Sequence, residues 1–418
     1  MIYGLLGKAI SHSFSKSIHE RSQPIDYALI STDNLADFFS EATCFAGNVT
    51  IPYKEDVLKY MDTLDSRVKS TQTANVIVLK NNQWHAYNTD IDGLMNTLKP
   101  RLPKDHNCLI SILGNGATKR SLVYALNALG YHNYHVFARH PMPGERALDA
   151  LNLATEVLIN TTPVGSLPAM DTSLVQDLTK FTSLKLVYDV INNPLRTQLV
   201  LDAMRLKIDA CSGIHMLFEQ ARLSHPHFGL KLHDQVAFNK IKHAWLFDHL
   251  NIVLIGMPFS GKTTLAQALS HALKREWIDT DHQIEIAYNA SVESLFQLHG
   301  EPYFRNLEKD VVFSLSHKTK CIISTGGGIG CDVTLMNAIK KQSIVVLIDV
   351  DQTLIQEVTL VNRPLLQSKQ DWLALYHKRI NQYKNNADIV IKKVDNNTEK
   401  IMHELVVKIN EYIYHQWA

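Results

Sequence analysis

The stretch GMPFSGKT, residues 256–263, constrains the fold of this 418-residue chain more than any other feature. It fits the pattern G-x-x-x-x-G-K-[ST] without a mismatch, follows the apolar run NIVLI and precedes the helix-like run TTLAQALSHALKR. Glycines let backbone N–H groups turn toward phosphate oxygens, and the N-terminus of the following helix adds positive charge. The alternative is a glycine loop without a ligand, but the flanking strand and helix favour a nucleotide site. In such a site Lys262 reaches the β- and γ-phosphates, and the Thr263 hydroxyl holds Mg²⁺.

A second glycine turn, LGNGAT at residues 113–118, also lies between an apolar run and an amphipathic helix. Strand-then-helix alternation continues along most of the chain, which predicts an α/β protein with mostly parallel sheets. We expect an α/β domain at 1–98 and a Rossmann-like domain at 99–207. Helices at 208–248 return to the first domain, and a P-loop domain with a central parallel sheet spans 249–418. No Gly/Ser-rich or Pro-rich linker separates the halves, so we expect a tight connection near residue 249.

Composition excludes several classes of function. Apolar residues make up 45% and charged residues 20%, an ordinary globular mixture, and the formal net charge of +1 favours neither a nucleic acid nor an anionic membrane as a partner. Five cysteines without C-x-x-C spacing indicate reduced thiols. The N-terminus has no signal-peptide pattern, and no apolar run is long enough to span a membrane. These features predict a cytoplasmic protein; they do not predict its oligomeric state.

Several polar motifs follow the phosphate loop. In WIDTDHQIE, Asp279 and Asp281 are two residues apart, so on an extended segment both would point toward the same side. Alone, the pair would suggest a solvated acidic loop. It is followed by GEPYFRNLE with Arg305, IISTGGG, RPLL with Arg363, and a helical run that contains Arg379. Together these motifs favour one aspartate for Mg²⁺ and one for an acceptor hydroxyl.

This ordered set resembles shikimate kinase from about residue 251 to the end of the chain, which implies that the domain at 249–418 is a kinase domain with its lid at about 352–366. The resemblance implies that Thr263 and Asp279 hold Mg²⁺, and that Asp281 orients or deprotonates the shikimate hydroxyl beside a catalytic Lys262. It implies a substrate-holding set of Asp281, Arg305, Gly327 and Arg379. The residues implied to bind ATP are Gly256, Ser260, Gly261, Lys262, Thr263, Thr264 and, in the lid, Arg363. Two departures from the family are a lid without further basic residues before RPLL, and Glu399 and Lys400 where an arginine often stacks on adenine.

The first half has its own candidate residues. The turn Gly114–Asn115–Gly116–Ala117 stands where a dinucleotide fold places its pyrophosphate turn, and Arg139 ends the next strand. An arginine there suits a 2′-phosphate, which points to NADP rather than NAD. Taken singly, Lys54 would be read as a surface lysine, and Ser13 and Ser15 as helix-capping residues.

Eight motifs in order, HSFSKSIH, NVTIPYKE, TAN, NTDIDG, GNGA, NTTPVG, DVINNP and GIHMLFEQA, resemble shikimate dehydrogenase across residues 1 to about 245. The resemblance implies that Lys54 and Asp90 are the catalytic pair. Ser13 and Ser15 would hold the substrate carboxylate, while Thr50, Asn75, Asp90 and Gln220 would contact the ring hydroxyls. It further implies that 1–98 is the substrate domain and 99–207 the NADP domain. The residues implied to hold NADP(H) are Gly114, Asn115, Gly116, Ala117, Arg139, Thr161, Val190, Gly213 and Met216.

The two resemblances together predict a bifunctional enzyme of the shikimate pathway, and so of aromatic amino acid biosynthesis. It would reduce 3-dehydroshikimate with NADPH and then phosphorylate shikimate with ATP and Mg²⁺. One departure lies in the first half, where Asn192 replaces the tyrosine that is common in the family. Two alternatives stay open: one half is a binding or regulatory module without chemistry, or the first half acts on quinate with NAD.

Overall fold

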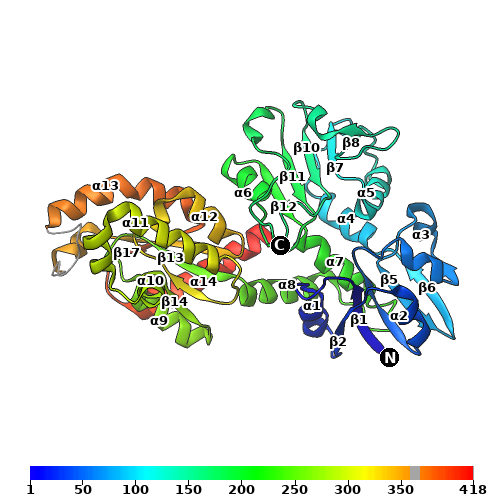
Figure 1. Cartoon of the computed structure of the whole chain (residues 1–418), viewed down its shortest axis with the longest axis horizontal. Coiled ribbons are helices and arrows are strands. Elements are labelled where there is room, and N and C mark those ends of the chain that lie inside the picture. The colour runs from blue at the N-terminus through cyan, green and yellow to red at the C-terminus, as the bar shows by residue number, and fades with distance from the viewer. Residues whose placement is uncertain (358–367, 418) are drawn as a thin grey trace. The chain divides into compact units, whose positions relative to one another are not determined.

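The computed structural model describes residues 1–357 and 368–417 and divides into two compact units, Met1–Lys242 and His243–Ala418 (Figure 1). The division falls inside one helix, α8, which spans Gln235–His249. In the described residues, no helix is long and apolar enough to cross a membrane.

The first sheet of unit 1 is mixed and has the strand order β2-β1-β3-β5-β6-β4. Its strands β1 to β3 are parallel, whereas β5 pairs antiparallel with both β3 and β6. The register places Gly4 between Ala28 and Gly47 on the neighbouring strands. The strands are β1 (Ile2–Gly7), β2 (Tyr27–Ser31), β3 (Phe45–Val49), β4 (Thr63–Leu64), β5 (Val76–Lys80) and β6 (Gln83–Tyr87).

The second sheet of unit 1 is parallel throughout, with the order β12-β11-β10-β7-β8-β9. The chain starts this sheet at β7 and builds outward on both sides, so the carboxyl end of β7 is the switch point where such folds bind ligands. The turn at residues 114–117 follows there. The strands are β7 (Ile110–Leu113), β8 (Tyr134–Ala138), β9 (Arg146–Ala147), β10 (Val157–Asn160), β11 (Leu186–Asp189) and β12 (Asp209–Ser212).

Helices α4 and α7 pack closely against each other, and both contribute residues to the buried cluster that contains Ile110 and Ile112 of β7. Gly93 of α4 permits this approach, because a Cβ there would lie 3.1 Å from the Met216 carbonyl oxygen. The helices of unit 1 are α1 (Ser15–Ser22), α2 (Leu35–Glu41), α3 (Ser66–Thr71), α4 (Asp90–Leu98), α5 (Ala117–Ala128), α6 (Gln198–Arg205) and α7 (Ile214–Ser224), with 3₁₀ turns η1 (Asp56–Tyr60), η2 (Leu148–Ala150) and η3 (Leu178–Lys180).

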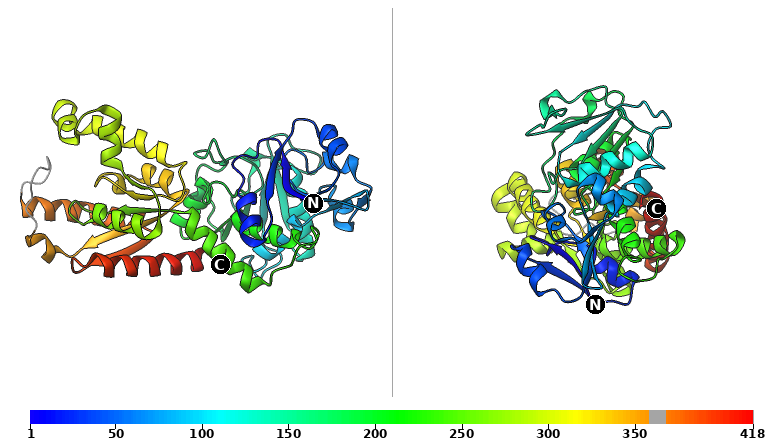
Figure 2. Two further views of the ribbon diagram at one scale, coloured as in Figure 1. Left: turned by 90° about the horizontal axis from the view of Figure 1, so that it is seen from below. Right: turned by 90° about the vertical axis from the view of Figure 1, so that its right-hand side faces the viewer.

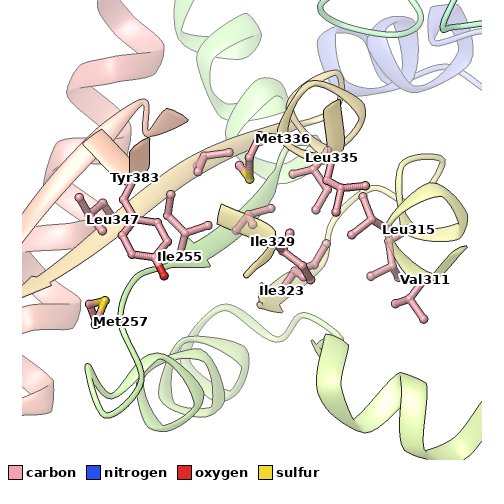
Figure 3. Close-up of a cluster of buried hydrophobic side chains, with 14 of the residues drawn as sticks. Ile255, Met257, Val311, Leu315, Ile323, Ile329, Leu335, Met336, Leu347 and Tyr383 are labelled. Atoms are coloured by element: carbon pink, nitrogen blue, oxygen red, sulfur yellow. The ribbon is translucent and has the colours of Figure 1, made fainter. Parts of the chain in front are cut away.

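Unit 2 has a five-stranded parallel sheet of order β14-β15-β13-β16-β17. Strands that are buried on both faces of a sheet are nearly continuous apolar runs. The sheet of unit 2 contains such runs, for example NIVLI in β13 and SIVVLIDV in β16. Ile255, Ile323 and Leu347 project from neighbouring strands into one buried cluster, which Figure 3 shows with Ile329 and Tyr383. The strands are β13 (Asn251–Ile255), β14 (Trp277–Asp279), β15 (Ile322–Ser324), β16 (Ser343–Val350) and β17 (Ile389–Lys393).

Helices cover both faces of this sheet (Figure 2). Helix α14 packs against α9 and β17, while α12 packs against α11 and β16. Helix α11 bends at Gly300, whose φ is 78°, just before Pro302. The helices of unit 2 are α9 (Lys262–Leu273), α10 (Thr280–Tyr288), α11 (Val292–Leu315), α12 (Val333–Lys340), α13 (Lys369–Asn386) and α14 (Thr398–Trp417), with 3₁₀ turns η4 (Ile329–Cys331) and η5 (Gln352–Glu357).

Candidate active sites

A lysine–aspartate pair forms the centre of the site in unit 1. Lys54 lies in the turn after β3, and Asp90 is the first residue of α4. The Lys54 Nζ donates a 2.6 Å hydrogen bond to Asp90 Oδ2, and the two side chains are only 13% and 6% exposed. An ammonium held against a carboxylate away from bulk water can act as a positioned acid–base group.

Three buried amide side chains form a network that holds Asp90 in place. Asn75 Nδ2 donates to Asp90 Oδ1 and to Gln220 Oε1, both at 3.0 Å, while Asn75 Oδ1 accepts the Thr89 N–H at 2.7 Å. Asn48 Nδ2 in turn donates to Gln220 Oε1 at 3.1 Å. Sequence reasoning singled out Asn75 and Gln220 but missed Asn48. The available signal was a polar residue inside the otherwise apolar strand β3.

The predicted substrate residues of unit 1 meet around one cavity of about 740 Å³. Ser13 and Ser15 lie at its edge, where the Ser13 hydroxyl donates to the Ser15 oxygen at 3.2 Å. Asn192 also lines the cavity, so the departure from the family pattern falls in the pocket itself. The other predicted residues in its lining are Thr50, Lys54, Asn75, Asp90, Thr161, Val190, Gly213, Met216 and Gln220.

A second cavity, of about 550 Å³, adjoins the first and shares Lys54 and Thr161 with it. The glycine turn lines it: Gly114 has φ +99°, and Gly116 caps α5 with open space where a Cβ would be. Arg139, just after β8, is exposed and lines the same cavity with Asn115 and Ala117. A glycine turn at a helix N-terminus, with a cation beyond the neighbouring strand, fits the pyrophosphate and ribose end of a dinucleotide.

The phosphate loop of unit 2 is folded around its lysine. Lys262 is 8% exposed, and its Nζ donates to the carbonyl oxygens of Gly256 at 3.0 Å and Met257 at 2.9 Å. Gly261 adopts φ +86°, a left-handed conformation that suits glycine, directly before α9 begins. Gly261, Lys262 and Thr263 line a cavity of about 330 Å³ together with Asp279, Asp281 and Gly327.

Three side-chain oxygens converge at the edge of this cavity. Asp279 Oδ2 accepts hydrogen bonds from Thr263 Oγ1 at 3.2 Å and from Ser324 Oγ at 2.7 Å. Hydroxyl and carboxylate oxygens are the ligands that Mg²⁺ prefers. Ser324 was missed from the sequence, although its place at the end of a strand before the glycines was a usable signal.

The extended geometry expected for both aspartates is wrong at Asp281. Only Asp279 ends a strand; Asp281 lies in the first turn of α10, where its backbone N–H donates to Asp279 Oδ1 at 3.0 Å. The helix forms because Asp279 is a good N-cap residue. Both side chains nevertheless line the same cavity, and a Cβ at Gly326 would lie too close to Asp281 Oδ1, so a side chain there would displace the Asp281 carboxylate.

Two arginines approach the glycine stretch after β15. Arg305 Nη1 donates to Glu308 Oε2 at 2.6 Å, and Arg305 Nη2 donates to Glu301 Oε1 at 2.6 Å. Burial raises the pKa of Glu308, and the Arg305 charge offsets only part of that effect. Arg379 Nη1 donates to the Gly327 carbonyl at 3.2 Å. The sequence motif contained Glu301 and Glu308, but their pairing with Arg305 was visible only in the fold.

A smaller cavity of about 200 Å³ lies on the other side of the phosphate loop and is lined by Ser260, Thr264 and Lys393. Lys393 ends β17, and its Nζ donates to the Ser260 carbonyl at 3.4 Å. No motif in the sequence pointed to Lys393. The predicted nucleotide residue Arg363, with most of the predicted lid, lies outside the described residues.

The two sites define two classes of enzyme in one chain. A dinucleotide-type sheet beside a lysine–aspartate pair defines an oxidoreductase. A phosphate-loop sheet with paired aspartates defines a phosphotransferase. Comparison with known families agrees with both. The model of the shikimate dehydrogenase substrate binding domain matches residues 5–77, and that of shikimate kinase matches residues 258–410. The chain belongs to the shikimate dehydrogenase family and carries a shikimate kinase domain in its second half, so both domains are those of shikimate-pathway enzymes.

Individual relatives support this assignment. Shikimate dehydrogenase (NADP(+)) of Dictyoglomus thermophilum is 31% identical over 252 residues, which cover 53% of this chain and 90% of that protein. The enzyme of the same name from Methanococcus vannielii is 28% identical, covering 54% and 89%. Among solved structures, a chorismate mutase/shikimate 5-dehydrogenase fusion from Clostridium acetobutylicum superposes with a TM-score of 0.53 at 25% identity, covering 58% of this chain and 96% of that one.

A Thermus thermophilus shikimate 5-dehydrogenase, solved in complex with NADP(H) and shikimate, superposes with a TM-score of 0.51. The two sequences are 23% identical, and the superposition covers 58% of this chain and 99% of that chain, so the two proteins share a fold.

Proposed function

We propose that the chain catalyses two consecutive reactions: NADPH-dependent reduction of 3-dehydroshikimate to shikimate, and ATP-dependent phosphorylation of shikimate to shikimate 3-phosphate. The observation that carries the first reaction is the 2.6 Å contact between Lys54 and Asp90 in a cavity that adjoins the glycine turn. The second reaction is supported by the arrangement of Thr263, Asp279 and Asp281 around the phosphate loop. The lysine and carboxylate groups can transfer protons, and the hydroxyl and carboxylate oxygens can hold Mg²⁺.

In the dehydrogenase reaction, the ketone oxygen gains negative charge as its carbon accepts a hydride. Lys54 Nζ would donate a proton to that oxygen, and the Asp90 carboxylate would stabilise the ammonium and orient it. NADPH, when bound, supplies the hydride. Ser13 and Ser15 would hold the substrate carboxylate, while Thr50, Asn75 and Gln220 would hold its ring hydroxyls.

The cavity beside the glycine turn is suited to a dinucleotide. A side chain at Gly114 would clash with Thr162, since its Cβ would lie 2.6 Å from the Thr162 methyl carbon. The open space at Gly116 leaves room for a phosphate near the N-terminus of α5. We assign the pyrophosphate to residues 114–117, the 2′-phosphate to Arg139, and the nicotinamide end to Thr161, Val190, Gly213 and Met216.

In the kinase reaction, Lys262 and the backbone N–H groups of the phosphate loop would hold the β- and γ-phosphates. Asp281 would take or orient the proton of the attacking hydroxyl, and Arg305 and Arg379 would hold the substrate carboxylate. Thr263 and Asp279 would hold Mg²⁺, which neutralises phosphate charge when bound. Within the described residues no group of three or more His, Cys, Asp or Glu side chains is arranged to hold a metal. This agrees with Mg²⁺ taking few protein ligands and keeping waters and phosphate oxygens.

One assay tests the proposal. Purified full-length protein is given 3-dehydroshikimate, NADPH and ATP–Mg²⁺, and shikimate and shikimate 3-phosphate are quantified over time. Both products must form, in that order. Reactions with NADH or with quinate and NAD test the alternative substrate, because a higher kcat/KM for that pair would reassign the first half. Shikimate that accumulates without shikimate 3-phosphate would identify a kinase half without chemistry. If neither product forms, adding shikimate and ATP–Mg²⁺ directly shows whether the dehydrogenase half alone lacks chemistry.

A further inference from the structure

The loop after β8 contains a carboxylate that neither reaction uses. Glu145 lies in the segment RHPMPGER, six residues beyond Arg139. Its Oε2 accepts hydrogen bonds from Asn115 Nδ2 at 3.0 Å and from the Met142 N–H at 2.9 Å. Its Oε1 lies 3.1 Å from Lys119 Nζ. Three donors from two separate segments therefore converge on one acidic side chain.

This carboxylate is charged and largely shielded from solvent. The Glu145 side chain is 7% exposed and that of Lys119 is 18% exposed. Burial alone would raise the pKa of Glu145, but the bonds from Met142, Asn115 and Lys119 outweigh it and hold the pKa below its usual value. A shielded charge acts on its neighbours more strongly than an exposed one, because less water screens it.

Glu145 is tied to the edge of the cavity assigned to the dinucleotide. Asn115 Nδ2 donates both to Glu145 and, at 3.0 Å, to the carbonyl of His140, the residue after Arg139. Asn115, Arg139 and His140 all line that cavity. In a dinucleotide fold, the residue at the end of this strand meets the ribose 2′ position. Asn115 therefore links the Glu145 carboxylate to the segment that would bind the 2′-phosphate.

The cations near the edge of this cavity are not equally available to a bound phosphate. Lys119, in the first turn of α5, has its charge balanced by Glu145. Arg146 Nη2 lies 3.3 Å from the His135 ring nitrogen, directed along the neighbouring strand. Arg139 is exposed and faces the cavity. Of these three cations, Arg139 is therefore the one that lines the cavity, while the charge of Lys119, in the first turn of the adjoining helix, is already compensated.

From this arrangement we infer that Glu145 is a specificity-determining residue that lowers the preference of the dehydrogenase for a 2′-phosphorylated cofactor. The inference rests on the proposed NADPH-dependent reduction and extends it. The carboxylate neutralises Lys119 and repels a doubly charged phosphate more than it repels a ribose hydroxyl. Removing its charge frees Lys119 to attract the 2′-phosphate, while the contacts of NADH stay nearly the same.

The test variant is Glu145→Gln in the full-length protein, since glutamine keeps the shape and the acceptor oxygen but removes the charge. We expect the ratio of kcat/KM for NADPH to that for NADH to rise about three- to tenfold, the range of a partly screened charge contact. The gain comes from a lower KM for NADPH and shrinks at high salt. Glu145→Asp keeps the charge and should stay near the wild-type ratio, which shows that the charge at this position sets the ratio.

Two further variants isolate the cause. Lys119→Met combined with Glu145→Gln should lose most of the gain, because the freed lysine is what attracts the phosphate. Glu156→Gln is the matched control: Glu156 Oε2 pairs with Lys185 at 2.5 Å in another part of the same domain. That variant should leave the cofactor ratio unchanged.

A binding measurement separates this inference from the proposed reaction. Titration with adenosine 2′,5′-bisphosphate and with adenosine 5′-monophosphate gives a ratio of Kd values that needs no turnover. Glu145→Gln should tighten the bisphosphate selectively. An unchanged ratio, or equal weakening of both ligands, overturns the inference and makes Glu145 a structural tie between two loops. Wild-type protein that binds the bisphosphate but does not reduce 3-dehydroshikimate contradicts the proposed function instead.

Discussion

Lys54 Nζ and Asp90 Oδ2 are 2.6 Å apart, although 36 positions separate the two residues in the chain. Asp90 is held in place on its other side by Asn75, whose Nδ2 donates to Oδ1 at 3.0 Å. The pair is therefore fixed by a turn after one strand and by the first residue of a helix. This relationship makes Lys54 the residue on which the first reaction depends most directly.

Replacing Lys54 by alanine should lower the dehydrogenase kcat by at least about 10²-fold, the scale of losing a positioned acid–base group. Kinase activity of the same protein should change little, because its residues lie in the other unit. The control is Lys59→Ala, which removes an exposed lysine that pairs with Asp56 at 2.7 Å. A Lys54 variant that keeps more than about half of its rate would remove Lys54 from the mechanism.

Arg139→Ala should raise the KM for NADPH and leave the KM for NADH nearly unchanged. A charge-assisted contact of this kind is worth on the order of 1.5–3 kcal/mol, which corresponds to about ten- to a hundredfold in KM. Initial rates at varied cofactor concentration measure the effect, with Arg146→Ala as the control. Equal weakening of both cofactors would mean that Arg139 is structural.

Asp281→Asn should lower the kinase kcat at least about 10²-fold, because an amide cannot take the proton of the attacking hydroxyl. The KM for ATP should stay close to that of the wild type, since Asp281 is not among the proposed nucleotide residues. Asp310→Asn, an exposed change on α11, serves as the control. A variant with normal turnover would show that another group receives the proton.

Dividing the chain at residue 243 should yield two active fragments, whereas a kinase fragment that begins at 251 should be less stable. Arg275 Nη1 donates to the Leu250 carbonyl at 3.0 Å, Arg275 also bonds the Phe247 carbonyl, and its guanidinium lies 5.0 Å from the centre of the Phe247 ring. Losing these partners leaves a partly buried cation unpaired, at a cost on the order of 2 kcal/mol.

Urea unfolding of fragments 243–418 and 251–418 measures this difference, and equal midpoints would contradict it. Mixing fragments 1–242 and 243–418 then tests independence of the halves. The lag before shikimate 3-phosphate appears should match that of the intact chain. A much shorter lag in the intact chain would mean that shikimate does not diffuse freely between the sites.

The dehydrogenase half should lose stability as the pH falls from about 6.5 to about 4. His225 is fully buried and contacts His19 at 3.1 Å between ring nitrogens, and burial lowers its pKa to about 4. The pKa of a histidine in the unfolded chain is about 6.5, so below that pH the unfolded state binds a proton that the folded state excludes. Stability is greatest above pH 6.5, and His225 alone accounts for a loss on the order of 3 kcal/mol.

Urea unfolding of the full-length protein at pH 7.5, 6 and 5 measures this loss. The transition of the dehydrogenase half is identified by its shift when NADPH is added, because NADPH is assigned to that half alone. His225→Gln cannot be protonated, so its stability should depend less steeply on pH. A variant with the same pH dependence as the wild type would assign the loss to other groups.

The sequence alone determined the parts of each site that are local. The phosphate loop at residues 256–263 and the turn at residues 114–117 each lie between a strand and a helix, so spacing alone fixes which backbone groups face a ligand. The α/β class also follows from local patterns, because buried parallel strands and amphipathic helices differ in the spacing of their apolar residues. The order of the motifs then identified both families.

Only the tertiary structure decided which distant residues meet. Arg305 pairs with both Glu301 and Glu308, Lys393 reaches the phosphate loop from the last strand, and Glu145 binds Asn115 and Lys119. None of these residues forms a motif by itself, and a single charged side chain in a sequence is usually a solvated one. The sequence also placed Asp281 on an extended segment, whereas the N-cap at Asp279 starts a helix there. Such contacts depend on strand order and helix packing, which bring together segments that local spacing cannot relate.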